Sequence, residues 1–201
     1  MFVLLLTLCS AQQLTPIPSP KDGYFLGPMM SNFTLDVFYD HLCVDSASAY
    51  PGLMQYFNDN QDWLGLNIHI YPLPYHLFSF VVAQAGRYIQ LKYPDKFVDY
   101  LTYMFQKQDY ILKNGKNWDF PTAQNKIALY ASQGTGVAFN EILNSLSDND
   151  LNWSSRVSWK YATSRLITGT PQYILNGVWI PGATDFTTAA DWTNYFAGFS
   201  G

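Results

Sequence analysis

The stretch VFYDHLCVDSASAYP, residues 37–51, joins two kinds of predicted local structure. It begins within the run FTLDVFY, residues 33–39, whose β-branched and aromatic residues predict a strand. Over residues 46–58 the apolar side chains recur at helical spacing, which predicts a helix. Cys43 therefore lies where a strand ends and a helix begins.

This position favours a reactive thiol. The free N–H groups and the dipole of a helix start stabilise an anion, and the thiolate is the nucleophilic form of cysteine. Ser46 follows one helical turn later and is expected to reach the sulfur with its hydroxyl. Protonated His41 would add positive charge nearby, whereas Asp45 would oppose it. We therefore expect an accessible, nucleophilic Cys43.

The spacing Cys43-Val44-Asp45-Ser46 is a C-x-x-S motif. In a C-x-x-C motif the second thiol releases a mixed disulfide by attacking the first sulfur. A serine hydroxyl cannot do this. A mixed disulfide at Cys43 would thus need an outside thiol, such as glutathione as a co-substrate.

A second feature lies near the C-terminus, in GTPQYILNGVWIPG, residues 169–182. Two short strands flank an Asn176-Gly177 turn, which is a strong hairpin signal. Thr170-Pro171 stands directly before the first of them, and proline is confined to strand starts, edges and bulges, often as a conserved cis bond. We expect this loop to face Cys43.

The order of elements indicates an α/β fold. A strand, a helix and a second strand at residues 64–71 are followed by helical patterns over about residues 76–165, then by the hairpin and a closing helix. This order predicts a four-stranded mixed sheet flanked by helices, with a helical block inserted between its halves. The domain would cover residues 32–201, after a Pro/Gly-rich linker at residues 12–31.

The first eleven residues resemble a signal peptide. A short apolar run is followed by small residues, Cys9 among them, and it is too short to span a bilayer. We expect cleavage near Ala11 and a secreted protein, or one in an endomembrane lumen. Of the two cysteines only Cys43 would then remain, so no internal disulfide is expected.

Composition excludes several classes of function. Apolar residues make up 48% of the chain and charged residues 13%, which predicts a folded domain. The net charge is -4 and the cations are scattered, which argues against nucleic-acid binding. Three scattered histidines and one mature cysteine do not predict a metal site.

The chain resembles thioredoxin-like proteins of the DsbA-like type, which carry a helical insertion. Three stretches bear the resemblance: VFYDHLCVDSASAYP, IHIYPLPYHLFSFVVAQAG and GTPQYILNGVWIPGA. It is also similar to eukaryotic thioredoxin-like proteins with C-P-D-S and P-L-P-Y-H motifs, although Val44 replaces the proline of the first. The resemblance implies a thioredoxin-like fold, a nucleophilic Cys43, and partner-backbone binding by Thr170 and Pro171.

Three functional hypotheses stay open. The first is monothiol thiol–disulfide exchange, in the manner of DsbA or protein-disulfide isomerase, with protein, peptide or glutathione disulfides. The second is a redox-inactive, chaperone-like module that binds peptides, and the third is a glutathione-dependent transferase or isomerase of the kappa type. In each, His76 is either an acid–base group of the substrate groove or a histidine with a structural hydrogen bond.

Overall fold

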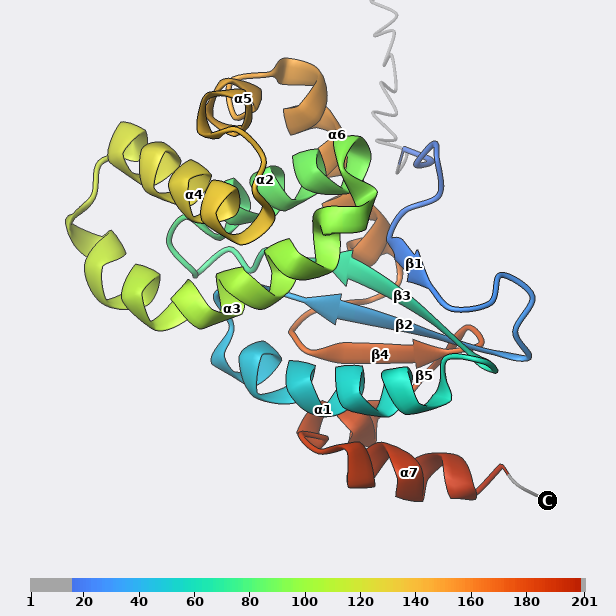
Figure 1. The fold of residues 1–201 in the computed structure, drawn as a ribbon. Coiled ribbons are helices and arrows are strands. Elements are labelled where there is room, and N and C mark those ends of the chain that lie inside the picture. Colours follow the sequence, from blue (N-terminus) through green and yellow to red (C-terminus); the bar gives the residue numbers. More distant parts are fainter. Residues whose placement is uncertain (1–15, 200–201) are drawn as a thin grey trace, which may run out of the picture.

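The computed structural model describes residues 16–199 (Figure 1). The expected signal peptide, with Cys9, lies outside the described residues, as do residues 12–15 of the expected linker. Within residues 16–199, no helix combines the length and apolar character that a bilayer crossing requires.

The centre of the molecule is a five-stranded mixed sheet. Its strands, in spatial order, are β1 (Tyr24–Leu26), β3 (Leu64–Ile70), β2 (Phe33–Tyr39), β4 (Gln172–Leu175) and β5 (Val178–Trp179). Strands β2 and β3 are parallel, and the other pairs are antiparallel. The β-α-β half and the hairpin half therefore meet between β2 and β4. This joins the two halves in one mixed sheet, as the order of elements predicted.

The sheet has one strand more than predicted. Strand β1 pairs antiparallel with β3, so that Tyr24 lies opposite Ile68. The prediction of a linker was therefore wrong for these three residues. A strand of three residues has no room for a readable alternation, and the surrounding prolines and glycines are typical of loops.

Seven α-helices surround the sheet in the described part of the chain. They are α1 (Val44–Asn60), α2 (Ser79–Lys92), α3 (Phe97–Asn114), α4 (Phe120–Thr135), α5 (Phe139–Ser145), α6 (Asn149–Ser164) and α7 (Ala189–Ala197). Three 3₁₀ turns, Pro94–Lys96, Gly115–Asn117 and Pro181–Asp185, complete the elements. Helices α2 to α6 lie between β3 and β4 in sequence, so the helical insertion is observed. Figure 1 shows α1 and α7 side by side below the sheet and the inserted helices gathered above it.

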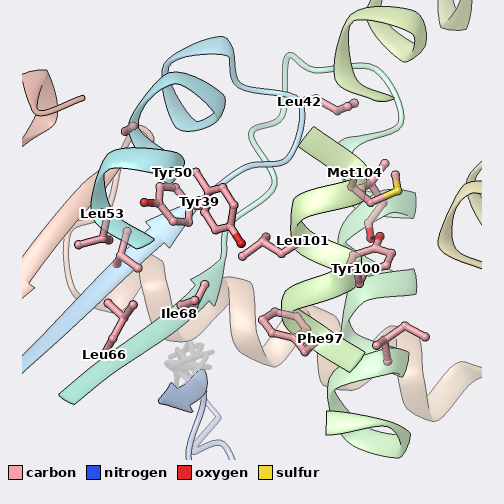
Figure 2. Close-up of a cluster of buried hydrophobic side chains, with 14 of the residues drawn as sticks. Tyr39, Leu42, Tyr50, Leu53, Leu66, Ile68, Phe97, Tyr100, Leu101 and Met104 are labelled. Carbon is pink, nitrogen blue, oxygen red and sulfur yellow. Dashed lines mark hydrogen bonds between the residues drawn. The ribbon is translucent and has the colours of Figure 1, made fainter. Parts of the chain in front are cut away.

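The insertion shares one core with the sheet. Leu66 and Ile68 from β3 and Leu53 from α1 belong to the same buried cluster as Tyr100 and Leu101 from α3 (Figure 2). Burial of such side chains contributes about 1.5–3 kcal/mol each. The inserted helices are therefore held to the sheet by the main hydrophobic core.

The opposite face of the sheet carries a smaller cluster. Strand alternation turns Phe38 and Ile174 to this side, where they meet Ala162 from α6 and Cys43. The aromatic ring of Phe38 also stacks on His69 at 4.5 Å between centroids. Helix α6 thus covers the face of the sheet that leads to the cysteine.

A buried charge network joins this face to the N-terminal segment. His69 Nδ1 lies 2.8 Å from Asp22 and its Nε2 lies 2.9 Å from Asp36, while Arg87 reaches Asp22 at 3.5 Å. Burial alone would lower the pKa of His69, but the hydrogen bonds to the two carboxylates raise it above its usual value. The network stabilises the segment that leads into β1.

Gly52 allows α1 to pack closely against the segment before α7. A Cβ atom at Gly52 would lie 2.3 Å from the Thr187 carbonyl oxygen, which is backbone and cannot swing away. Alanine favours the helix by up to about 1 kcal/mol over glycine, but the steric clash costs more. We therefore expect Gly52→Ala to lower the free energy of unfolding by about 1–3 kcal/mol in total. Urea unfolding would measure this. Gly182→Ala is the control, because nothing lies within 4 Å of its Cβ position; equal effects of both changes would contradict the close approach.

Candidate active site

Cys43 is the N-cap residue of α1, with an extended backbone at φ −84° and ψ 121°. Its carbonyl oxygen accepts from Ala47 N at 3.1 Å and from Gln108 Nε2 at 2.8 Å. Gln108, which is buried on α3, also donates to the His41 carbonyl at 2.8 Å. A side chain of the insertion therefore holds the backbone on which the cysteine sits, and no sequence pattern pointed to it.

The sulfur faces the proline loop. Cys43 Sγ lies 3.2 Å from the carbonyl oxygen of Thr170, and the Thr170–Pro171 peptide bond is cis. The two loops come from positions 127 residues apart in the chain. The structure thus brings together the thiol and the residues that the resemblance assigns to partner binding.

The thiol is more buried than expected. Cys43 is only 6% exposed and packs among Leu73, Ile167 and Ile174. The prediction of an accessible sulfur was therefore wrong for the unbound protein. The apolar side chains of the segment after β3 and of the loop before β4 close over it, which a pattern around the cysteine alone cannot show.

Ser46 does not serve the sulfur in this structure. Its side chain is fully buried, and its hydroxyl oxygen accepts from the Asp40 backbone N–H at 3.4 Å. Within residues 16–199 no hydrogen bond joins this hydroxyl to Cys43 Sγ. Ser46 instead stabilises the turn between β2 and α1.

Asp40 is the polar centre of this turn. Its buried carboxylate accepts from the backbone N–H groups of Leu42 at 2.9 Å and Leu73 at 3.0 Å. It also accepts from the Ser79 hydroxyl and pairs with His76 Nδ1 at 2.7 Å. One side chain thereby ties the end of β2 to the segment after β3 and to the start of α2.

His41 is buried and carries no positive charge at neutral pH. Its ring lies 5.3 Å from Tyr100 and 5.8 Å from Phe105, and neither ring nitrogen has a hydrogen-bond partner in the described part of the chain. Burial lowers the pKa of His41 to about 4, although the charge of Asp40 acts in the opposite direction. The expectation that His41 assists the thiolate was therefore wrong.

His76 lies away from the proline loop. Its hydrogen bond to Asp40 matches the structural alternative, and its side chain is 20% exposed to a different cavity from the one beside Pro171. The position of His76 therefore does not favour an acid–base role in a groove next to Cys43.

A polar groove of about 440 Å³ runs beside the proline loop. One wall is the loop itself, and the others come from the start of α1 and the segment before α7. Its lining residues are Asp45, Ser48, Gly169, Thr170, Pro171, Gln172, Thr184, Asp185 and Thr187. The groove has two carboxylates and no cation in its lining. In residues 16–199 no cluster of side chains is suited to hold a metal ion.

Replacing His41 tests its neutral, unpaired state. The unfolded chain protonates this histidine near its ordinary pKa of about 6.5, whereas the folded protein resists protonation down to about 4. Stability from the neutral ring is therefore present above about pH 6.5 and is lost as the pH falls toward 4.

We expect His41→Leu to be more stable than the parent, by about 1–2 kcal/mol more near pH 5 than near pH 7.5. Urea unfolding of both proteins at the two pH values measures this difference. A stability gap that does not widen on acidification would show that His41 titrates normally in the fold.

The sheet order and the inserted helices define the class of fold: a thioredoxin-like fold with a helical insertion, as in DsbA-type structures. The turn that carries Cys43 and the Thr170–Pro171 loop face each other within it. No protein-family model and no curated protein matches the chain. Among solved structures, a protein proposed to be a protein-disulfide isomerase from Pseudomonas syringae matches at 18% identity. That match covers 87% of this chain and 97% of the other, with a TM-score of 0.73.

Two further solved structures show the same arrangement. Oxidised BdbD from Bacillus subtilis matches at 17% identity over 92% of this chain and 96% of its own, with a TM-score of 0.70. A periplasmic thioredoxin-like protein from Salmonella enterica serovar Typhimurium matches at 19% identity over 87% and 86%, with a TM-score of 0.61. At such identities the likeness establishes the fold, and activity must be argued from the site.

Proposed function

We propose that this protein carries out thiol–disulfide exchange through the single thiol of Cys43, with protein or peptide partners. The observation that carries the proposal is the 3.2 Å approach of Cys43 Sγ to the Thr170 carbonyl, beside cis-Pro171. A nucleophile at a helix start, next to a strand-leading loop with a groove alongside, suits attack on an extended partner.

The reaction would run in two exchanges. The Cys43 thiol loses its proton to solvent, and the thiolate attacks one sulfur of a partner disulfide. A new S–S bond joins Cys43 to the partner, and the other partner sulfur leaves as a thiolate that takes up a proton. An external thiolate, glutathione in our proposal, then attacks the partner sulfur of the mixed disulfide. A new S–S bond joins glutathione to the partner, and Cys43 leaves as a thiolate that takes up a proton.

Thr170 and Pro171 would bind the partner backbone. The Thr170 carbonyl that now accepts from the thiol would be released when the sulfur bonds to the partner, and would then be free to accept a partner N–H. Pro171 offers no N–H of its own, so pairing would depend on Thr170 and on residues after the proline. The partner thereby competes for the contact that now covers the sulfur.

A second candidate function is peptide binding without redox chemistry. It is favoured by the 6% exposure of Cys43 and by the burial of Ser46, which leaves no second nucleophile at the site. In that case the polar groove would hold an extended segment, and the thiol would be a buried apolar residue.

Glutathionylation of Cys43 separates the two functions. With Cys9→Ser as background, oxidised glutathione is expected to add one glutathionyl group in the folded protein, and Cys43→Ser to add none. Intact-mass spectrometry would measure both. The binding module would be favoured by two results together. Cys43 would stay unmodified until the protein is unfolded, and the proteins with and without Cys43→Ser would suppress the aggregation of an unfolded protein equally.

Ser46→Cys tests the missing resolving thiol. The introduced sulfur would sit one turn from Cys43 and attack the mixed disulfide, so we expect the lifetime of that species to fall by about tenfold or more. Quenched time courses with oxidised glutathione would compare both proteins in the Cys9→Ser background. An unchanged lifetime would mean that position 46 is too deeply buried to resolve the intermediate.

The two carboxylates of the groove predict a charge preference. Asp45 and Asp185 are both exposed and line the groove together with Pro171. Opposite charges steer encounter, so a peptide whose cysteine is held in a disulfide and flanked by lysine should react faster with Cys43 than the same peptide disulfide flanked by glutamate.

We expect Asp45→Asn combined with Asp185→Asn to reduce this preference by about two- to fivefold at low salt. Rates of mixed-disulfide formation with the two peptides would measure it. Asp59→Asn with Asp62→Asn is a control of equal charge, because these exposed residues lie outside the groove. An equal loss in the control would mean that net charge alone sets the preference.

We extend the proposal to the cellular compartment in which the protein acts. A signal peptide at residues 1–11 would direct the chain to a secreted or endomembrane location, where disulfides persist. The periplasmic location of the Salmonella protein supports this choice.

A further inference from the structure

A second cavity, of about 620 Å³, lies between the segment after β3 and helix α6. It is distinct from the polar groove, and its walls are mainly apolar. They include Leu73, Phe78, Phe80, Val81, Phe120 and Trp159. Its size falls within the range of roughly 300–1,000 Å³ that is typical of small-molecule sites.

The charged groups at this cavity are all basic. Arg156 and Lys160, one turn apart on α6, line it, and no carboxylate is among its lining residues. Neither cation forms an ion pair with an acidic side chain of residues 16–199; both instead lie near the ring of Trp153, at 5.5 and 5.9 Å. Two cations without such an ion pair beside an apolar cavity would attract a ligand that carries a negative charge.

His76 supplies an oriented polar group. Since its Nδ1 donates to the buried carboxylate of Asp40 at 2.7 Å, Nε2 of the neutral ring is left as a hydrogen-bond acceptor at the cavity wall, where it does not compete with the cations for an anionic group. Such pairing fixes the ring, so that its direction does not depend on the ligand.

The backbone at the cavity wall is held in an uncommon conformation. Phe78, which caps α2, has φ 66° and ψ 7°, a left-handed geometry that costs a bulky residue of order 1–3 kcal/mol. Its ring stacks on Trp118 at 6.4 Å, next to the opening of α4. The fold tolerates this strain at a point where it shapes the cavity.

We propose that the cavity binds a small amphipathic carboxylate, with its apolar chain against the aromatic wall and its anionic head at Arg156 and Lys160. The apolar lining selects the chain, and the two cations without an ion pair in the described part of the protein select the charge. This site goes beyond the proposed thiol exchange and does not use Cys43. Its ligand would be a free small molecule.

Decanoate is a suitable probe, with decanol as the neutral ligand of equal chain length. Calorimetric titration of the Cys9→Ser protein is expected to show decanoate binding at least about tenfold tighter than decanol. Arg156→Gln combined with Lys160→Gln should remove about tenfold of decanoate affinity and leave decanol unchanged. Phe120→Ala, at a residue 57% exposed, should weaken both ligands several-fold without unfolding the protein.

Matched controls make the outcome decisive. Lys92→Gln combined with Lys96→Gln changes the charge equally at the far end of α2 and should leave both affinities unchanged. Cys43→Ser should bind decanoate like the parent, so failure of the redox proposal would not affect this result. The proposal is overturned if decanoate binds no tighter than decanol or if the α6 double variant keeps full affinity. Tighter binding of an apolar heptapeptide with one glutamate would overturn it too.

Discussion

The carboxylate of Asp40 is the interaction on which the candidate site depends. It lies at the end of β2, fully buried, and accepts hydrogen bonds from two backbone N–H groups, a serine hydroxyl and His76. A buried charge is tolerated only when it is satisfied in this way, and removal of its partners is strongly destabilising. Because these partners come from three segments, the same carboxylate fixes where α1 and α2 begin.

The position of Cys43 follows from that constraint and from the insertion. The turn after Asp40 places the cysteine at the N-cap of α1, and Gln108 of α3 holds the carbonyl groups of residues 41 and 43. The proline loop then meets the sulfur from the other half of the sheet. The inserted helices are thus a part of the site. The hydrophobic core that they share with α1 holds them in a fixed position relative to that helix.

Local patterns predicted the parts of the structure that depend on local rules. The strand at residues 33–39, the helix start at Cys43 and the Thr170-Pro171 loop before a hairpin all follow from propensity and turn chemistry. Burial of His41 did not, because a strand-end histidine looks the same whether or not another element covers it. Strand β1 was not predicted because three residues are too few to show an alternation. The role of Gln108 was not predicted because a single buried glutamine on a helix forms no sequence pattern.

The cover over the sulfur also bears on how long the thiol lasts. Oxidation from sulfenic to sulfinic and sulfonic acid proceeds fastest at exposed thiolates, and the last two forms are not readily reversed. With Cys43 only 6% exposed and its sulfur against the Thr170 carbonyl, any reagent must wait for this cover to open, so oxidation is expected to be slower than at an exposed thiol. Among residues 16–199 Cys43 is the only cysteine, so no second thiol of this part of the chain can convert a sulfenic acid into a disulfide. The cover over the sulfur therefore protects the one thiol on which the proposed exchange depends.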